Sequence, residues 1–287
     1  MTDSERGQAP QDSAGLIRTP SSQVLPVAAG HDAPQRVILL GASNVARSFA
    51  TVVAVSGTIW GRPLEIMAAI GHGRSYGRRT TCFGRSLPGI AECGLWKSLD
   101  ARPHAQTAAL VTDVGNDLLY DTPVAVIRGW VESCLDRLAR HDARIVMTQL
   151  PVANMHVLSP RRFLFFRRVF FPNCNLGLEQ VVDRALELNV SLVDLAASRG
   201  IPMSPLRPEW YGMDPIHIRL QSWSSAWSEI LSAWQADQRS SIARRASFAQ
   251  WLYLRSLAPE QRWLLGREQR RVQPAARYRD GTTVSLY

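Results

Sequence analysis

Short apolar runs and helical patterns alternate along most of this chain. The run from Arg36 to Leu40 closes at Gly41, as expected for a buried strand, and apolar residues then recur every three or four positions up to Gly57. The alternation continues beyond that first pair. We expect further strands at 64–70, 107–112, 144–150 and 190–195, and further helices at 123–139, 176–188 and 220–234.

Five apolar strands separated by helices predict an α/β fold. The expected architecture is a three-layer α/β/α sandwich, in which a five-stranded parallel sheet is covered by helices on both faces. Functional groups in such folds collect in the loops beyond the carboxyl ends of the strands. We therefore look for chemistry in the segments that directly follow each strand.

The two ends of the chain differ from this region. Residues 1–34 are rich in Ser, Pro, Gln, Gly and Ala without periodicity, which predicts a disordered leader before an α/β domain at 35–238. Residues 239–287 form a C-terminal extension. We expect Pro259 to divide it into two short helices, with irregular chain from Arg267 onward.

The sequence offers no sign of a membrane span or a secretory signal. It contains no uncharged apolar run of about 18 residues, and its N-terminus mixes charges without leading into a hydrophobic run. The four cysteines form no C-x-x-C pair and have no histidine at zinc-finger spacing. We therefore predict a cytoplasmic protein with free thiols and no metal site.

The net charge of +9 is concentrated in the extension. From Arg239 onward the chain carries ten arginines and three acidic residues, which leaves 23 basic and 21 acidic residues before it. The α/β domain is thus nearly neutral, and an electrostatic partner would bind the extension. Such a partner would be an anionic surface or another protein. A nucleic acid is not expected, because no nucleic-acid-binding motif accompanies the charge.

Candidate functional residues lie in the loops that follow four of the expected strands. They are Ser43 after the first strand, Gly73 after the second, Asn116 after the third, and Asp214 with His217 in the loop after the fifth. Each has an ordinary structural explanation when taken alone: a helix cap, a turn glycine, a turn opener or a packing histidine. Those explanations do not account for all of them falling at the carboxyl ends of strands.

Acyl transfer needs this set of groups. A serine hydroxyl becomes nucleophilic when a neutral imidazole takes its proton, and a carboxylate holds that imidazole in the right tautomer. Asp214 and His217 are three residues apart and can meet across one turn. The Asn116 amide and the backbone N–H groups of Ser43 and Gly73 could stabilise the oxyanion.

In these blocks the sequence resembles the SGNH hydrolases, also called GDSL-type esterases and lipases. The matching segments are Gly41-Ala42-Ser43, Gly73 (in preference to Gly71), Gly115-Asn116-Asp117 and Asp214-Pro215-Ile216-His217. The resemblance covers about residues 36–236. It implies a flavodoxin-like fold with a five-stranded parallel sheet, catalytic Ser43, Asp214 and His217, an oxyanion hole of Ser43, Gly73 and Asn116, and neither a metal nor an organic cofactor.

One residue departs from the family pattern. Ala42 stands where the family usually carries an aspartate, whose hydrogen bonds support the loop of the nucleophile. The G-x-S-x-G elbow of the separate α/β-hydrolase group is absent around Ser43, which argues against that fold.

Two aromatic and basic segments allow two interpretations each. Residues 160–172 carry five phenylalanines and four arginines between two prolines. They could form a short helix packed on the body, or a lid over the site that touches a membrane surface. The aromatics of the extension could likewise pack on the domain or dock a partner.

We conclude from the sequence that the protein is a serine esterase acting on a small-molecule ester, such as an acylated carbohydrate or a lipid. An acyltransferase with the same site, and a non-catalytic binding protein on a hydrolase fold, are the alternatives. Ala42 is the feature that favours the non-catalytic alternative.

Overall fold

The computed structural model describes residues 35–156, 159–171, 174–212, 214–235 and 246–287. The expected leader at 1–34 lies outside these residues, as does the boundary of the extension near residue 239.

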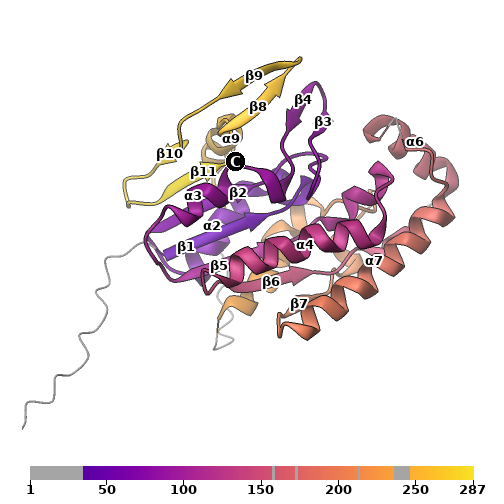
Figure 1. The fold of residues 1–287 in the computed structure, drawn as a ribbon, viewed down its shortest axis with the longest axis horizontal. Helices are drawn as coiled ribbons and strands as arrows, with labels where there is room; N and C mark the ends of the chain where they lie inside the picture. Colours follow the sequence, from indigo (N-terminus) through magenta and orange to yellow (C-terminus); the bar gives the residue numbers. More distant parts are fainter. Residues whose placement is uncertain (1–34, 157–158, 172–173, 213, 236–245) are drawn as a thin grey trace, which may run out of the picture. The chain divides into compact units, whose positions relative to one another are not determined.

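Seven strands form the central sheet, in the order β10-β11-β2-β1-β5-β6-β7 (Figure 1). Every neighbouring pair from β11 to β7 is parallel, and β10 is antiparallel to β11. The strands are β1 (Gln35–Leu40), β2 (Leu64–Ala69), β5 (Thr107–Val111), β6 (Arg144–Thr148), β7 (Met203–Ser204), β10 (Ala276–Arg277) and β11 (Thr283–Leu286). The expected parallel α/β sheet is therefore present, with two additional strands at one edge.

Helices cover both faces of this sheet, as expected for strands that are apolar on both sides. In β1, Ile38 and Leu40 pack towards α3, α4 and α7, whereas Val37 and Leu39 pack towards α2, α8 and α9. The helices are α1 (Ser43–Arg47), α2 (Phe49–Ile59), α3 (Leu95–Asp100), α4 (Val124–Ala139), α5 (Val152–His156), α6 (Pro160–Phe170), α7 (Leu178–Ser198), α8 (Trp223–Leu231) and α9 (Phe248–Ser256). None of the helices in the described ranges is both long enough and apolar enough to cross a bilayer.

The strand expected at 190–195 is wrong, because these residues belong to α7. Val181, Ala185, Leu188, Leu192 and Leu195 are buried at helical spacing, while Val190 is 59% exposed. The helical period therefore continues through the segment, and the fifth parallel strand of the α/β domain is the two-residue β7 that follows it.

The expected structure of the C-terminal extension is also wrong beyond its first helix. After α9 the chain forms β8 (Gln261–Leu264) and β9 (Arg267–Arg270) and then the strands β10 and β11. β11 pairs with β2 in the central sheet. β8 pairs with β4 (Arg85–Leu87) and completes a second sheet in the order β3-β4-β8-β9, where β3 spans Thr80–Cys82 (Figure 1). The extension thus packs onto the domain, as one of the two interpretations expected.

Candidate active site

Ser43, His217 and Asp214 form one continuous hydrogen-bonded chain. Ser43 is the first residue of α1, directly beyond the carboxyl end of β1. Its Oγ lies 2.9 Å from Nε2 of His217, and Nδ1 of the same ring lies 2.6 Å from Oδ2 of Asp214. The His217 side chain is 10% exposed, so the imidazole is held between the hydroxyl and the carboxylate with little access to water.

Asp214 is held in its ionised form by its surroundings. Burial acts to raise the pKa of its carboxyl, but the hydrogen bond and charge of His217, the Ile216 N–H and the charge of Arg47 together bring that pKa below its ordinary value. The second oxygen, Oδ1, accepts the backbone N–H groups of Ile216 and His217, each at 3.2 Å. An ionised carboxylate in this position fixes Nδ1 of His217 as the protonated nitrogen and leaves Nε2 to accept a proton from Ser43.

The two other residues expected at the site line the same cavity. A cavity of about 300 Å³ is bordered by Ser43, Gly73, Asn116, Asp214 and His217. The Nδ2 atom of Asn116 is buried and has no hydrogen-bond partner among the described residues, so it is a donor without an acceptor at the cavity wall. The structure therefore brings all five residues singled out in the sequence to one place.

The turn at Gly73 depends on the absence of a side chain. Its φ angle is +61°, and an added Cβ would lie 3.0 Å from the Tyr120 hydroxyl and 3.4 Å from Cβ of Cys82. The Tyr120 hydroxyl also donates to the Gly73 carbonyl oxygen at 2.6 Å. Glycine thus permits both the left-handed conformation and the close contact that fixes this peptide.

Asp113 supports the loop of the nucleophile, in a role that the sequence did not reveal. Its Oδ2 accepts the backbone N–H groups of Ala42, at 2.9 Å, and Asn44, at 3.0 Å, and its Oδ1 accepts Nδ2 of Asn44 at 2.8 Å. Ala42 itself is fully buried. A carboxylate beyond β5 therefore supplies the loop hydrogen bonds for which position 42 has no side chain.

Asn44 links the serine loop to the histidine loop, and it too was missed. Besides its bond to Asp113, Nδ2 donates to the Ile216 carbonyl at 2.9 Å, and Oδ1 accepts the Ile218 N–H at 2.8 Å. These contacts flank His217 on both sides along the chain. The sequence signals available were the position of Asn44 beside Ser43 and the position of Asp113 just after a buried strand.

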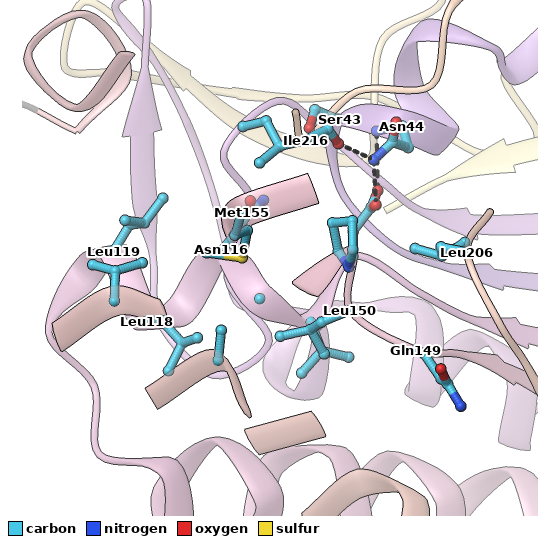
Figure 2. Close-up of a pocket in the computed structure, with 16 residues that line it drawn as sticks. Ser43, Asn44, Asn116, Leu118, Leu119, Gln149, Leu150, Met155, Leu206 and Ile216 are labelled. Carbon is cyan, nitrogen blue, oxygen red and sulfur yellow. Dashed lines mark hydrogen bonds between the residues drawn. The ribbon is translucent and has the colours of Figure 1, made fainter. Parts of the chain in front are cut away.

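A second, apolar cavity opens on the other side of Ser43. It has a volume of about 70 Å³ and shares Ser43, Asn116 and Ile216 with the first cavity. Figure 2 shows Asn116 and Met155 between Ser43 and Leu150, with the chain of hydrogen bonds from Asn44 at the upper edge. Its remaining apolar wall comes from Val114, Leu118, Leu119, Pro151, Val181, Ala185 and Leu206.

The aromatic and basic segment at 160–172 forms helix α6 up to Phe170, and Pro172 lies outside the described residues. Phe163 and Phe171 are buried, and Phe171 borders the cavity that contains Ser43. Leu164 and Phe165 are 50% and 63% exposed. The segment thus packs part of its aromatic surface on the body, and a lid function for its exposed part stays a prediction.

No three side chains of His, Cys, Asp or Glu gather closely enough to hold a metal ion anywhere in the described ranges.

Comparison with known proteins finds similarity in structure. No family model and no curated protein sequence matches the chain. Among solved structures, the chain is similar to the psychrotrophic esterase EstA from a Pseudoalteromonas species, at 11% identity and a TM-score of 0.43, over 69% of this chain and 96% of that one. It is similar to a lipolytic protein of the G-D-S-L family from Veillonella parvula, at 9% identity and a TM-score of 0.44, over 68% and 94% of the two chains. The chain is also similar to TesA, at 13% identity and a TM-score of 0.44, over 69% of this chain and 97% of that one.

These identities and TM-scores are low, and they carry no assignment of activity.

Proposed function

We propose that the protein is a serine esterase that cleaves a carboxylic ester through an acyl-enzyme. The observation that carries the proposal is the chain of two hydrogen bonds, 2.9 Å from Ser43 Oγ to His217 Nε2 and 2.6 Å from His217 Nδ1 to Asp214 Oδ2. Nucleophile, base and orienting group lie within hydrogen-bond reach of one another, which is the requirement for activating a serine hydroxyl.

In the first half of the reaction, Ser43 Oγ attacks the ester carbonyl carbon and its proton passes to His217 Nε2. The imidazolium that forms is stabilised by the ionised Asp214. The carbonyl oxygen becomes an oxyanion, which accepts hydrogen bonds from the Asn116 amide and the backbone N–H groups of Ser43 and Gly73. His217 then gives its proton to the leaving alcohol as the carbon–oxygen bond breaks, and the acyl group remains on Ser43.

In the second half, water takes the place of the alcohol. His217 removes a proton from the water as it attacks the acyl-enzyme, and returns the proton to Ser43 Oγ as the carboxylic acid leaves. The unpaired Nδ2 of Asn116 supports its role in both halves, because this residue borders the cavity and its donor gives up no other hydrogen bond to bind the oxyanion.

The non-catalytic alternative loses its main support. That alternative rested on Ala42, where the usual aspartate is missing from the serine loop. Asp113 accepts two backbone N–H groups of this loop, those of Ala42 and Asn44, so a carboxylate that follows β5 supports the loop.

The test is hydrolysis of 4-nitrophenyl acetate by the wild-type protein and by Ser43→Ala. We expect turnover by the wild-type protein and a loss of about 10³-fold or more in kcat for Ser43→Ala. A thermal melt of both proteins serves as the control for folding. Equal rates for the two proteins would show that Ser43 only begins helix α1, and would refute the proposal.

A further inference from the structure

Three arginines surround a larger cavity that adjoins the candidate site. This cavity has a volume of about 400 Å³ and lies between the α/β domain and the C-terminal extension. Arg47 comes from α1, Arg85 from β4 and Arg255 from α9. We call it the arginine cavity. Arg47, His72 and Arg255 also line the cavity that contains Ser43, so the two cavities adjoin each other.

The positive charge of the arginine cavity is not balanced by acidic side chains. Asp214 is the one carboxylate among the residues lining the two spaces, and it already pairs with His217. Arg47 Nη1 lies 3.7 Å from that same carboxylate. In the described part of the chain, Arg85 and Arg255 form no ion pair with any carboxylate.

Some arginines elsewhere in the described ranges have a carboxylate partner, although most have none. Arg36, for example, contacts Glu65 at 2.8 Å, and Arg199 contacts Glu132 at 3.0 Å. By contrast, Arg85 is half-buried, and burial together with the charge of Arg262 lowers its pKa. A partly buried guanidinium without a counter-charge is unfavourable unless a ligand supplies one.

His72 lies in the field of the same charges. Burial, which is the largest cause, and the charges of Arg85, His217, Arg255 and Arg47, in that order of effect, together lower its pKa to about 4. The imidazole is therefore neutral at neutral pH. It can bind an anion as a hydrogen-bond donor, and it adds no charge that repels the arginines.

The position of His217 decides which part of an ester would reach the arginines. His217 and Asp214 line the side of the site that opens into the arginine cavity, and neither lines the apolar cavity. The leaving alcohol must take its proton from His217 Nε2 and so leaves on that side. The acyl group is then directed to the apolar cavity beyond Asn116.

We propose that the site, acting as the esterase proposed above, selects esters whose leaving alcohol carries an anionic group such as a carboxylate, sulfate or phosphate. Arg85 and Arg255 bind this anion, with Arg47 beside them, and a small apolar acyl group occupies the other cavity. Planar guanidinium groups suit such oxyanions because they offer paired N–H donors. The inference rests on the proposed function for its chemistry. Its specificity rests on Arg85 and Arg255, which have no carboxylate partner among the described residues; Arg255 also lies over the ring of Trp251, 5.0 Å from its centroid.

The test compares two acetate esters that differ by one charge, phenyl acetate and 4-acetoxybenzenesulfonate. The measured quantity is the ratio of kcat/KM for the sulfonate ester to kcat/KM for phenyl acetate. In the double variant Arg85→Gln/Arg255→Gln we expect this ratio to fall about tenfold or more, since a hydrogen bond to a charged group is worth that factor or more. Comparing ratios removes the intrinsic difference between the two leaving groups.

The matched control is Arg267→Gln/Arg277→Gln, which removes two exposed arginines from the C-terminal segment outside either cavity. It changes the net charge equally and is expected to keep the wild-type ratio. If the first double variant fails to fold, the exposed Arg255→Gln alone must lower the ratio. A ratio equal in wild type, variant and control would overturn the inference while leaving the esterase proposal intact.

Binding provides a second measurement that does not need turnover. Calorimetric titration with 4-hydroxybenzenesulfonate and with phenol compares the two leaving alcohols directly. We expect the sulfonate to bind the wild-type protein more tightly, and the preference to be lost in Arg85→Gln/Arg255→Gln and reduced at high salt. Absence of hydrolysis with retained sulfonate binding would refute the esterase and keep the anion site. Equal binding of the two alcohols would refute the anion site.

Discussion

Asp113→Asn should disable the site because Asp113 holds the loop that carries Ser43. Asp113 has a left-handed backbone, with φ of 60°, which asparagine tolerates, so the substitution adds no backbone strain. The Asn oxygen can still accept the N–H groups of Ala42 and Asn44. Its amide nitrogen then faces Nδ2 of Asn44, where the aspartate offered an oxygen at 2.8 Å. An acceptor is thus replaced by a donor.

The magnitude follows from the hydrogen bond that is lost. A hydrogen bond to a charged group contributes about 1.5–3 kcal/mol. If that loss falls on the folded state, the melting temperature drops by about 3–12 °C for a domain of this size. If instead the lost free energy raises the barrier of the reaction, because Ser43 is misplaced in the transition state, kcat/KM drops about 10- to 150-fold. We expect both quantities to fall, because Asn44 also holds the backbone on either side of His217.

The assay is kcat/KM for 4-nitrophenyl acetate together with a thermal melt. Asp121→Asn is a matched control, because Asp121 also has a left-handed backbone, with φ of 54°, at the other end of the same short 3₁₀ segment. Its carboxylate forms an exposed ion pair with Arg184. Such pairs contribute about 0–1 kcal/mol, so Asp121→Asn should leave kcat/KM unchanged. Wild-type kcat/KM and melting temperature in Asp113→Asn would refute this account of the serine loop.

Three further predictions concern the glycine turn, a buried acid and the C-terminal strands. Gly73→Ala should abolish ester hydrolysis. Gly200 has a similar φ of +63° but open space around it, so Gly200→Ala should lose only stability. Equal steady-state rates of ester hydrolysis for the two variants would contradict this. Burial raises the pKa of Asp117 to about 6, so the folded chain binds this proton more tightly than the unfolded chain. The free energy of unfolding of the wild-type protein, relative to that of Asp117→Asn, should therefore fall as pH rises from about 4 to about 6 and then level off. If urea denaturation gives the same difference between the two proteins at every pH in this range, the prediction is contradicted. A chain ending at residue 245 should be insoluble, because it loses β11 and exposes the edge of β2; a soluble truncated protein with wild-type activity would show that the extension is separable.

The sequence predicted the central layers well because strand burial leaves a local signal. Runs such as Val37–Leu40 are apolar at every position, which is the pattern of a strand covered on both faces. Chemistry at the strand ends was predictable for the same reason. Once parallel strands are assigned, their carboxyl ends share one edge, and the polar residues there must lie near one another.

The features that the sequence did not reveal depend on pairing between distant segments. The ladder that joins Ser86 to Trp263 pairs residues 177 positions apart. Residues 261–270 are mostly polar, and their apolar run is only three residues long, so they give a weak local signal of a strand. The bonds from Asp113 to the serine loop likewise join residues about 70 positions apart. At 190–195, a short apolar run fits a strand or a helix equally well. The two are distinguished only by the helical spacing of apolar residues, which continues from the preceding segment through this run.

The most direct measurement of the central claim is covalent labelling by a fluorophosphonate probe, followed by mass spectrometry of the labelled peptide. The probe reacts with a serine only when a base has activated its hydroxyl. We predict one labelled residue, Ser43, in the wild-type protein, and loss of labelling in both Ser43→Ala and His217→Ala while both variants keep a cooperative thermal melt. An unlabelled wild-type protein, or a label on Ser43 that survives His217→Ala, would contradict the assignment of Ser43 and His217 as nucleophile and base.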